Sequence, residues 1–131
     1  MKTTTWVAGA LFVVLLLLSP NNANAAPWYG PTTVTWYGPG YYGHGFACGG
    51  TYYPKARGVA VNRRFARCGA RFTIRYRGRV VRVQVVDRCP GCNTSTHIFD
   101  LTARSQMDLI CGRGHWCRPH TIRGRWHHGW K

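Results

Sequence analysis

Acidic residues are nearly absent from this sequence of 131 residues. It contains three acidic residues, all aspartate, against 18 lysines and arginines, and its formal net charge is +15 at pH 7. Any chemistry that requires a carboxyl group must therefore use Asp87, Asp100 or Asp108. So large a basic excess goes beyond what solubility requires, and it predicts a polyanionic partner such as an acidic wall polymer, peptidoglycan, anionic lipid or nucleic acid.

The chain also lacks a hydrophobic run long enough to anchor it in a membrane. The apolar segment over residues 6–18 is shorter than the ~20 residues that a spanning helix needs. It follows Lys2 and precedes Ala23-Asn24-Ala25, a small-x-small cleavage site, and no cysteine follows that site to carry a lipid. We therefore predict a signal peptide over residues 1–25, a secreted or periplasmic location and no stable membrane anchor. Export also argues against nucleic acid as the partner.

The remaining length suits one small domain. We place this domain at residues 26–117 and expect it to be a monomer. Residues 118–131 show neither the period of a strand nor that of a helix, and they contain Trp126-His127-His128-Gly129-Trp130. We predict that they form a basic, aromatic tail outside the domain.

An even number of cysteines in an exported small domain indicates disulfides, each contributing ~2–4 kcal/mol. Two alternatives are a zinc site, for which Cys89-x2-Cys92, Cys111-x5-Cys117, His97 and His115 have tolerable spacing, and a redox dithiol at Cys89-Pro90-Gly91-Cys92. The oxidising environment outside the cytosol favours disulfides, so we expect neither a metal nor another cofactor. The sequence does not choose the pairing of Cys48, Cys68, Cys89, Cys92, Cys111 and Cys117.

Alternating apolar and polar residues predict strands over residues 71–76 and 80–86, joined by a turn at Arg77-Gly78. Residues 98–101 predict another short strand, and Thr102 is suited to be the N-cap of a helix over residues 103–110. Short strands with glycine turns and one small helix are typical of a compact β-barrel.

Residues 26–46 are rich in glycine, proline, tyrosine and tryptophan, and include Trp36 and Tyr37. Exposed rings in this segment are suited to stack on sugars or bases. The same rings are equally suited to cover the open end of a small barrel.

Five short motifs occur in an order that resembles a known family. They are Thr35-Trp36-Tyr37-Gly38, Ala47-Cys48-Gly49-Gly50, Cys68-Gly69-Ala70-Arg71-Phe72, Val85-Val86-Asp87-Arg88 and Phe99-Asp100-Leu101-Thr102. In this order they resemble the rare lipoprotein A-like proteins, with expansins, barwin-like proteins and family 45 endoglucanases as more distant relatives. The resemblance covers residues 34–110 and implies a mainly β fold, a six-stranded double-psi β-barrel with one short helix.

The resemblance also implies a function, the lytic transglycosylation of peptidoglycan glycan strands. Asp87 matches the carboxylate implicated in the family, and Asp100 matches the aspartate of the expansin and endoglucanase His-Phe-Asp-Leu motif. Thr51 stands where the family has a glutamate, and Asn62 where it has a histidine. The substrate-binding residues that we expect are Trp36, Tyr37, Thr51, Asn62 and Arg88.

Hydrolysis of a glycosidic bond generally needs two carboxyl groups, one to protonate the leaving oxygen and one to activate water or attack the sugar. Lytic transglycosylation uses the muramic acid 6-hydroxyl as an internal nucleophile, so one carboxyl group can suffice. We therefore predict lytic transglycosylase-type action, with Asp87 as acid/base and Asp100 as a second polar group. The alternatives are a non-catalytic, expansin- or barwin-like module that binds peptidoglycan or another anionic wall polysaccharide, and a small cationic defence or inhibitor protein.

Overall fold

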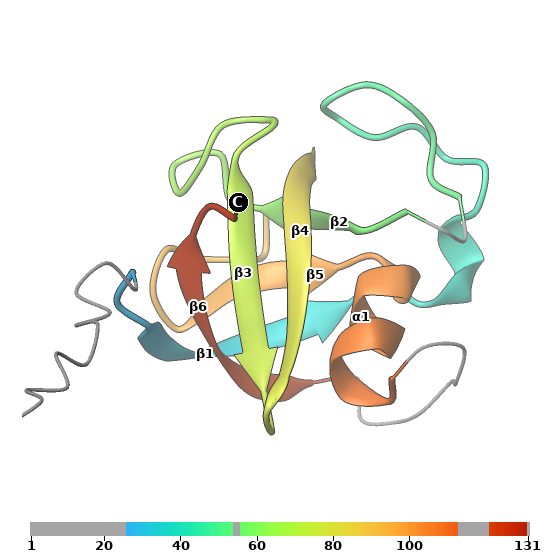
Figure 1. Cartoon of the computed structure of the whole chain (residues 1–131). Coiled ribbons are helices and arrows are strands. Elements are labelled where there is room, and N and C mark those ends of the chain that lie inside the picture. Colours follow the sequence, from blue (N-terminus) through green and yellow to red (C-terminus); the bar gives the residue numbers. More distant parts are fainter. Residues whose placement is uncertain (1–25, 54–55, 113–120, 131) are drawn as a thin grey trace, which may run out of the picture.

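The computed structural model describes residues 26–53, 56–112 and 121–130. These residues form a closed barrel of six strands with one α-helix beside it (Figure 1). In chain order the elements are β1 (Tyr29–Trp36), the 3-10 turn η1 (Pro39–Tyr41), β2 (Gly58–Val61), β3 (Arg71–Tyr76), β4 (Arg79–Arg88), β5 (His97–Leu101), α1 (Ala103–Ile110) and β6 (Ile122–His128). The predicted signal peptide lies outside the described residues.

The order of strands around the barrel is β1-β5-β2-β4-β3-β6. Two neighbouring pairs, β1 with β5 and β2 with β4, are parallel, and the other pairs are antiparallel. The prediction of a mainly β, six-stranded barrel with one short helix is confirmed. No helix among the described residues has the length and apolar character needed to cross a membrane.

The predicted hairpin of β3 and β4 is present, with Arg71 opposite Gln84 and Tyr76 opposite Arg79. Its two turn residues, Arg77 and Gly78, have φ values of 46° and 76°. Positive φ at both central residues is what a two-residue turn requires to match the right-handed twist of the strands. The predicted strand at 98–101 and the helix at 103–110 also form.

One apolar cluster fills the barrel, because alternate residues of each strand point inward. The side chain of Phe65, from the loop between β2 and β3, stacks on Phe72 and meets Phe99 and Trp126 edge to face. The buried members of the cluster are Val34, Val59, Val61, Phe72, Ile74, Val81, Val83, Val85, Ile98, Phe99, Leu101, Leu109, Ile122 and Trp126.

The prediction that residues 118–131 form a tail outside the domain is wrong for the part that the structure describes. Residues 122–128 form β6, which pairs with both β1 and β3 and so closes the barrel. Buried and exposed residues do alternate in β6, where Ile122, Gly124 and Trp126 are buried. The pattern is not visible in the sequence because the central buried residue is a glycine, which has no apolar side chain. A Cβ at Gly124 would lie 3.3 Å from Ile74 Cγ2 and 3.4 Å from Val34 Cγ2, so a larger residue there would require these core side chains to shift.

The disulfide prediction is confirmed for the described cysteines. Cys48 pairs with Cys68, and Cys89 pairs with Cys92. Cys111 is also disulfide-bonded, whereas Cys117 lies outside the described residues. The four sulfurs of the two bridges are therefore not available as thiolate ligands or as a free dithiol.

Gly58 begins β2 at a point where the backbone passes close to other side chains. A Cβ added at Gly58 would lie 2.4 Å from Val86 Cγ2 and 3.1 Å from Thr102 Cγ2. We expect Gly58→Ala to lower the free energy of unfolding by ~1–3 kcal/mol, as overpacking of a filled site does. Urea denaturation would measure this change. Gly91→Ala is the control, since a Cβ there meets nothing within 4 Å, and equal effects of the two substitutions would contradict the packing argument.

Candidate functional site

A pocket of about 440 Å³ opens beside the ends of β1, β4 and β5. The long connection between β1 and β2, at the right of Figure 1, and the loop that follows β4 supply the rest of its wall. The pocket combines aromatic rings with two of the three carboxyl groups of the chain. It is lined by Trp36, Tyr37, Tyr41, His44, Gly45, Phe46, Tyr52, Asp87, Arg88, Cys89, Pro90 and Asp100.

The strand register brings the two carboxyl groups to the pocket. Ala60 of β2 lies opposite Asp100 of β5 on one side and opposite Asp87 of β4 on the other. Thr35 of β1 lies opposite Asp100 in turn, so one row crosses four strands in the order Thr35, Asp100, Ala60, Asp87. Residues opposite one another share a face of the sheet. The small side chain of Ala60 therefore separates two carboxyl groups on the face that points away from the apolar core.

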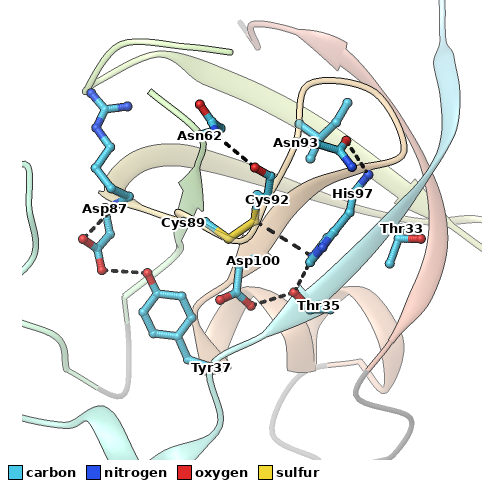
Figure 2. The surroundings of a disulfide bond; sticks show 12 residues. Thr33, Thr35, Tyr37, Asn62, Asp87, Cys89, Cys92, Asn93, His97 and Asp100 are labelled. Atoms are coloured by element: carbon cyan, nitrogen blue, oxygen red, sulfur yellow. Dashed lines mark hydrogen bonds between the residues drawn. A yellow bond between two sulfur atoms is a disulfide. The ribbon is translucent and has the colours of Figure 1, made fainter. Parts of the chain in front are cut away.

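Asp87 is surrounded by hydrogen-bond donors. The hydroxyl of Tyr37 donates to its Oδ2 at 2.7 Å, and the backbone amides of Ala47 and Arg88 both donate to its Oδ1 at 2.8 Å. Figure 2 shows the Tyr37 ring reaching up to this carboxylate. Burial, followed by the hydrogen bond to Asp87, raises the pKa of the Tyr37 hydroxyl. Tyr37 thus remains a neutral donor, and Asp87 is held in one orientation.

Asp100 has a different environment. Its Oδ1 accepts a hydrogen bond of 2.9 Å from the Thr35 hydroxyl, and Thr35 Oγ1 lies 2.9 Å from His97 Nε2. Figure 2 shows this chain of three side chains below the Cys89–Cys92 bridge. Burial raises the pKa of the Asp100 carboxyl, with a smaller contribution from the charge of Asp87, while the Thr35 hydrogen bond and His97 act in the opposite direction. Asp100 therefore holds its proton to a higher pH than an exposed aspartate does.

Aromatic rings attach the long connection to the barrel. Tyr52 is buried, stacks on Tyr42 and contacts Tyr37 and Phe46. Its hydroxyl accepts a hydrogen bond from the amide of Ala103 at the start of α1. Tyr41 and Tyr42 remain 50% and 39% exposed. Tyr52 thus helps to cover the barrel end, whereas Tyr41 and Tyr42 leave part of their surface accessible to solvent.

Five of the predicted site residues meet in the pocket, namely Trp36, Tyr37, Asp87, Arg88 and Asp100. Thr51 is exposed and forms an isolated bridge with Gly45, a pocket residue, but does not itself line the pocket. Asn62 lies in a second depression, where its Nδ2 donates to the carbonyl oxygen of Cys92 at 2.9 Å. Thr51 and Asn62, which stand where the resembling family has a glutamate and a histidine, therefore lie outside the row that contains Asp87 and Asp100.

Sequence reasoning missed Thr35 and His97 as partners of Asp100. One signal for Thr35 was available, because residues two apart on a strand share a face and Tyr37 was already expected in the site. Nothing local marked His97, whose place depends on the pairing of β5 with β1. Tyr41 and Phe46 lie in the aromatic segment that was expected either to stack on sugars or to cover the barrel, whereas nothing in the sequence marked His44 or Tyr52 for the pocket.

Comparison with known proteins establishes the fold. No protein-family model matches the chain, and no curated protein matches it in sequence. Among solved structures, the Streptomyces papain inhibitor is 22% identical with a TM-score of 0.54, and the match covers 76% of this chain and 91% of the inhibitor. The apo form of the Clavibacter michiganensis expansin is 23% identical with a TM-score of 0.56. That match covers 76% of this chain and 49% of the expansin, so the chain spans about half of the expansin's length. The barrel is thus a double-psi β-barrel.

Proposed function

We propose that this chain is a secreted or periplasmic protein that binds cell-wall glycan in the pocket without cleaving it, in the way expansins act on wall polymers. The observation that carries the proposal is the joint presence of two carboxyl groups and the rings of Trp36, Tyr37 and Tyr41 in one open pocket. A sugar ring presents an apolar face and several hydroxyl groups, which such a surface can satisfy together. The disulfides and the likeness to an expansin support it further.

Binding is favoured over hydrolysis by the surroundings of Asp87. Its oxygens already accept three of the about four hydrogen bonds that a carboxylate can accept, which leaves little capacity to activate water. Thr51 and Asn62 contribute no carboxyl or imidazole group at the positions where the resembling family has them. A two-carboxyl mechanism would therefore have to use Asp87 and Asp100, and the hydrogen bonds that Asp87 already accepts disfavour it as the group that activates water.

Lytic transglycosylation is the second candidate, and one observation favours it. It needs a single proton-carrying group, and burial raises the pKa of Asp100. Sequence analysis assigned this role to Asp87, whereas the environments of the two groups favour Asp100 as the acid. A lytic enzyme would release 1,6-anhydromuramic products, which a binding protein would not.

The test is retention on insoluble peptidoglycan combined with mass spectrometry of the soluble fraction. We expect the protein to be retained and no anhydro products to appear. Tyr41→Ala is expected to weaken retention about fivefold, the effect of losing ~1 kcal/mol of ring contact. Tyr53→Ala is the matched control, because Tyr53 is 56% exposed and lies outside the pocket lining.

Other outcomes of this test would change the proposal. Anhydro products from the wild type that disappear in Asp100→Asn would replace binding with lytic action. The likeness to a papain inhibitor, which covers 91% of that inhibitor, makes inhibition of a protease a further alternative, so the same preparation should be assayed against papain. Inhibition of papain without retention on any glycan would overturn the wall-binding proposal.

A further inference from the structure

The structure contains a second depression, of about 470 Å³, that adjoins the aromatic pocket. It is lined by Asn62, Arg63, Arg64, Arg88, Cys89 and Pro90, and the last three residues line both cavities. We propose that Arg63, Arg64 and Arg88 form a binding site for a carboxylate carried by the glycan, here called the arginine cradle. The inference rests on the proposed function, since it names the class of glycan that the pocket takes.

The arginine cradle carries positive charge that no carboxylate of its lining offsets. Three arginines line the depression, and none of the lining residues is acidic. Among the described residues, ion pairs join Arg57 and Arg104 to Asp108, so neither Arg63 nor Arg64 is neutralised by a carboxylate. Asp87, next to Arg88 in the chain, directs its oxygens to Tyr37 and to two backbone amides. The positive charge of these three arginines is therefore available to an anion from outside the chain.

The frame that carries the arginines is rigid. Asn62 Oδ1 accepts a hydrogen bond of 2.9 Å from the Arg64 amide, and Asn62 Nδ2 donates to the Cys92 carbonyl. Asn62 thus ties the turn that carries Arg63 and Arg64 to the loop closed by the Cys89–Cys92 bridge, as Figure 2 shows for the Asn62–Cys92 contact. This gives Asn62 a positioning role.

Arg88 is also held in place. Its Nη1 donates to the Ala66 carbonyl oxygen at 2.7 Å, and its Nη2 lies 3.2 Å from Cys68 Sγ in a disulfide. A guanidinium group has five N–H donors, so two contacts leave donors for a ligand. Arginine pairs with carboxylates through its planar fork, and a preorganised frame reduces the entropy lost on binding.

The position of the cradle specifies the ligand. A sugar bound beside Asp100 and the aromatic rings would extend past Arg88, Cys89 and Pro90 toward Arg63 and Arg64. The glycan should therefore carry a carboxylate close to the ring that occupies the aromatic pocket. Two wall glycans have this chemistry, uronic acid polymers and the lactyl or peptide carboxylates of peptidoglycan, and the experiment separates them.

The experiment compares wild type with the double variant Arg63→Gln/Arg64→Gln. Both proteins are tested on polygalacturonate and on peptidoglycan. Each is also tested on the neutralised polymers, which are fully methyl-esterified polygalacturonate and carboxyl-amidated peptidoglycan. The control double variant is Arg82→Gln/Arg123→Gln, which removes the same charge from exposed positions on β4 and β6. We expect the first double variant to lose about tenfold or more in affinity for at least one acidic polymer, the effect of one lost charge-assisted contact. We expect little change on the neutralised forms and a smaller loss in the control.

Equal losses in the two double variants would overturn the cradle and show that charge acts diffusely, while the glycan-binding proposal would stand. No retention of wild type on any polymer would overturn the proposed function. A second measurement then tests whether the arginine cradle binds a carboxylate. It follows the NMR signals of the arginine Nε–Hε groups during titration with galacturonate or with its methyl ester. Shifts of Arg63, Arg64 or Arg88 with the acid alone support the cradle, and equal responses to both compounds reject it.

Discussion

A chain that ends at Thr121, and so lacks β6, is expected to lose cooperative folding altogether. β6 pairs with β1 and β3, and its removal would leave two unpaired strand edges in place of a closed barrel. It would also remove Trp126, which is 8% exposed and packs against Phe72 and Phe99. Truncating one such buried ring costs ~3–5 kcal/mol, and the total stability of a small domain is only ~5–15 kcal/mol. Thermal unfolding followed by circular dichroism would measure the loss.

The matched control for this truncation is a chain that ends at Gly129. It keeps β6 and the two hydrogen bonds that join Gly129 to β3, from the Gly129 amide to the Arg71 carbonyl and from the Thr73 hydroxyl to the Gly129 carbonyl. This chain should unfold cooperatively at close to the wild-type temperature. If the chain ending at Thr121 did so as well, residues 122–131 would be the dispensable tail that their sequence pattern suggested.

Replacement of Asp100 is expected to have the largest effect on glycan binding. The proposal gives its carboxyl group a direct hydrogen bond to the bound sugar, so Asp100→Ala should weaken binding by ~10- to 150-fold, which corresponds to ~1.5–3 kcal/mol. Asp100→Asn should retain more affinity, because an amide can donate the same hydrogen bond while its oxygen still accepts from Thr35. Isothermal titration with an uncharged oligosaccharide would measure both variants.

The pH dependence of binding provides a second test of Asp100. Burial raises its pKa, and the protonated form is the one that donates a hydrogen bond. Wild-type affinity should therefore be highest in acid and fall as the pH rises through the raised pKa, whereas Asp100→Asn should show a flatter profile. His97, Asp87 and Tyr37 surround this group, so the difference between the two profiles, rather than either alone, reports Asp100. Identical profiles would remove Asp100 from the binding mechanism.

The stability of these variants is a necessary check, and its sign also follows from the pKa. A carboxyl group with a raised pKa in the folded chain favours folding in acid, and this contribution is lost as the pH rises through the folded pKa. Asp100→Asn should therefore be more stable than wild type at neutral pH, with the difference shrinking in acid. Such a loss of stability at neutral pH is expected of a carboxyl group that is kept for function.

Local patterns in the sequence were sufficient for the elements that have a regular period. The β3–β4 hairpin, β5 and α1 were predicted because alternation, a turn at Arg77-Gly78 and a helix start at Thr102 are each encoded by neighbouring residues. β2 and β6 were not predicted. β2 is buried throughout and only four residues long, so it shows no alternation, and the inward position of β6 at Gly124 carries no side chain.

By itself the sequence determined which chemical groups are available to a functional site. They are three aspartate carboxyl groups, an excess of arginine, six cysteines and a set of aromatic rings. It also placed Asp87 directly after one predicted strand and Asp100 within another. Only the tertiary structure decided that both carboxyl groups flank Ala60, that Thr35 and His97 support Asp100, and that Asn62 holds a turn beside Arg88. These relations join residues that lie far apart in the chain. They depend on strand order and register around a closed barrel, which long-range packing fixes and local sequence patterns do not encode.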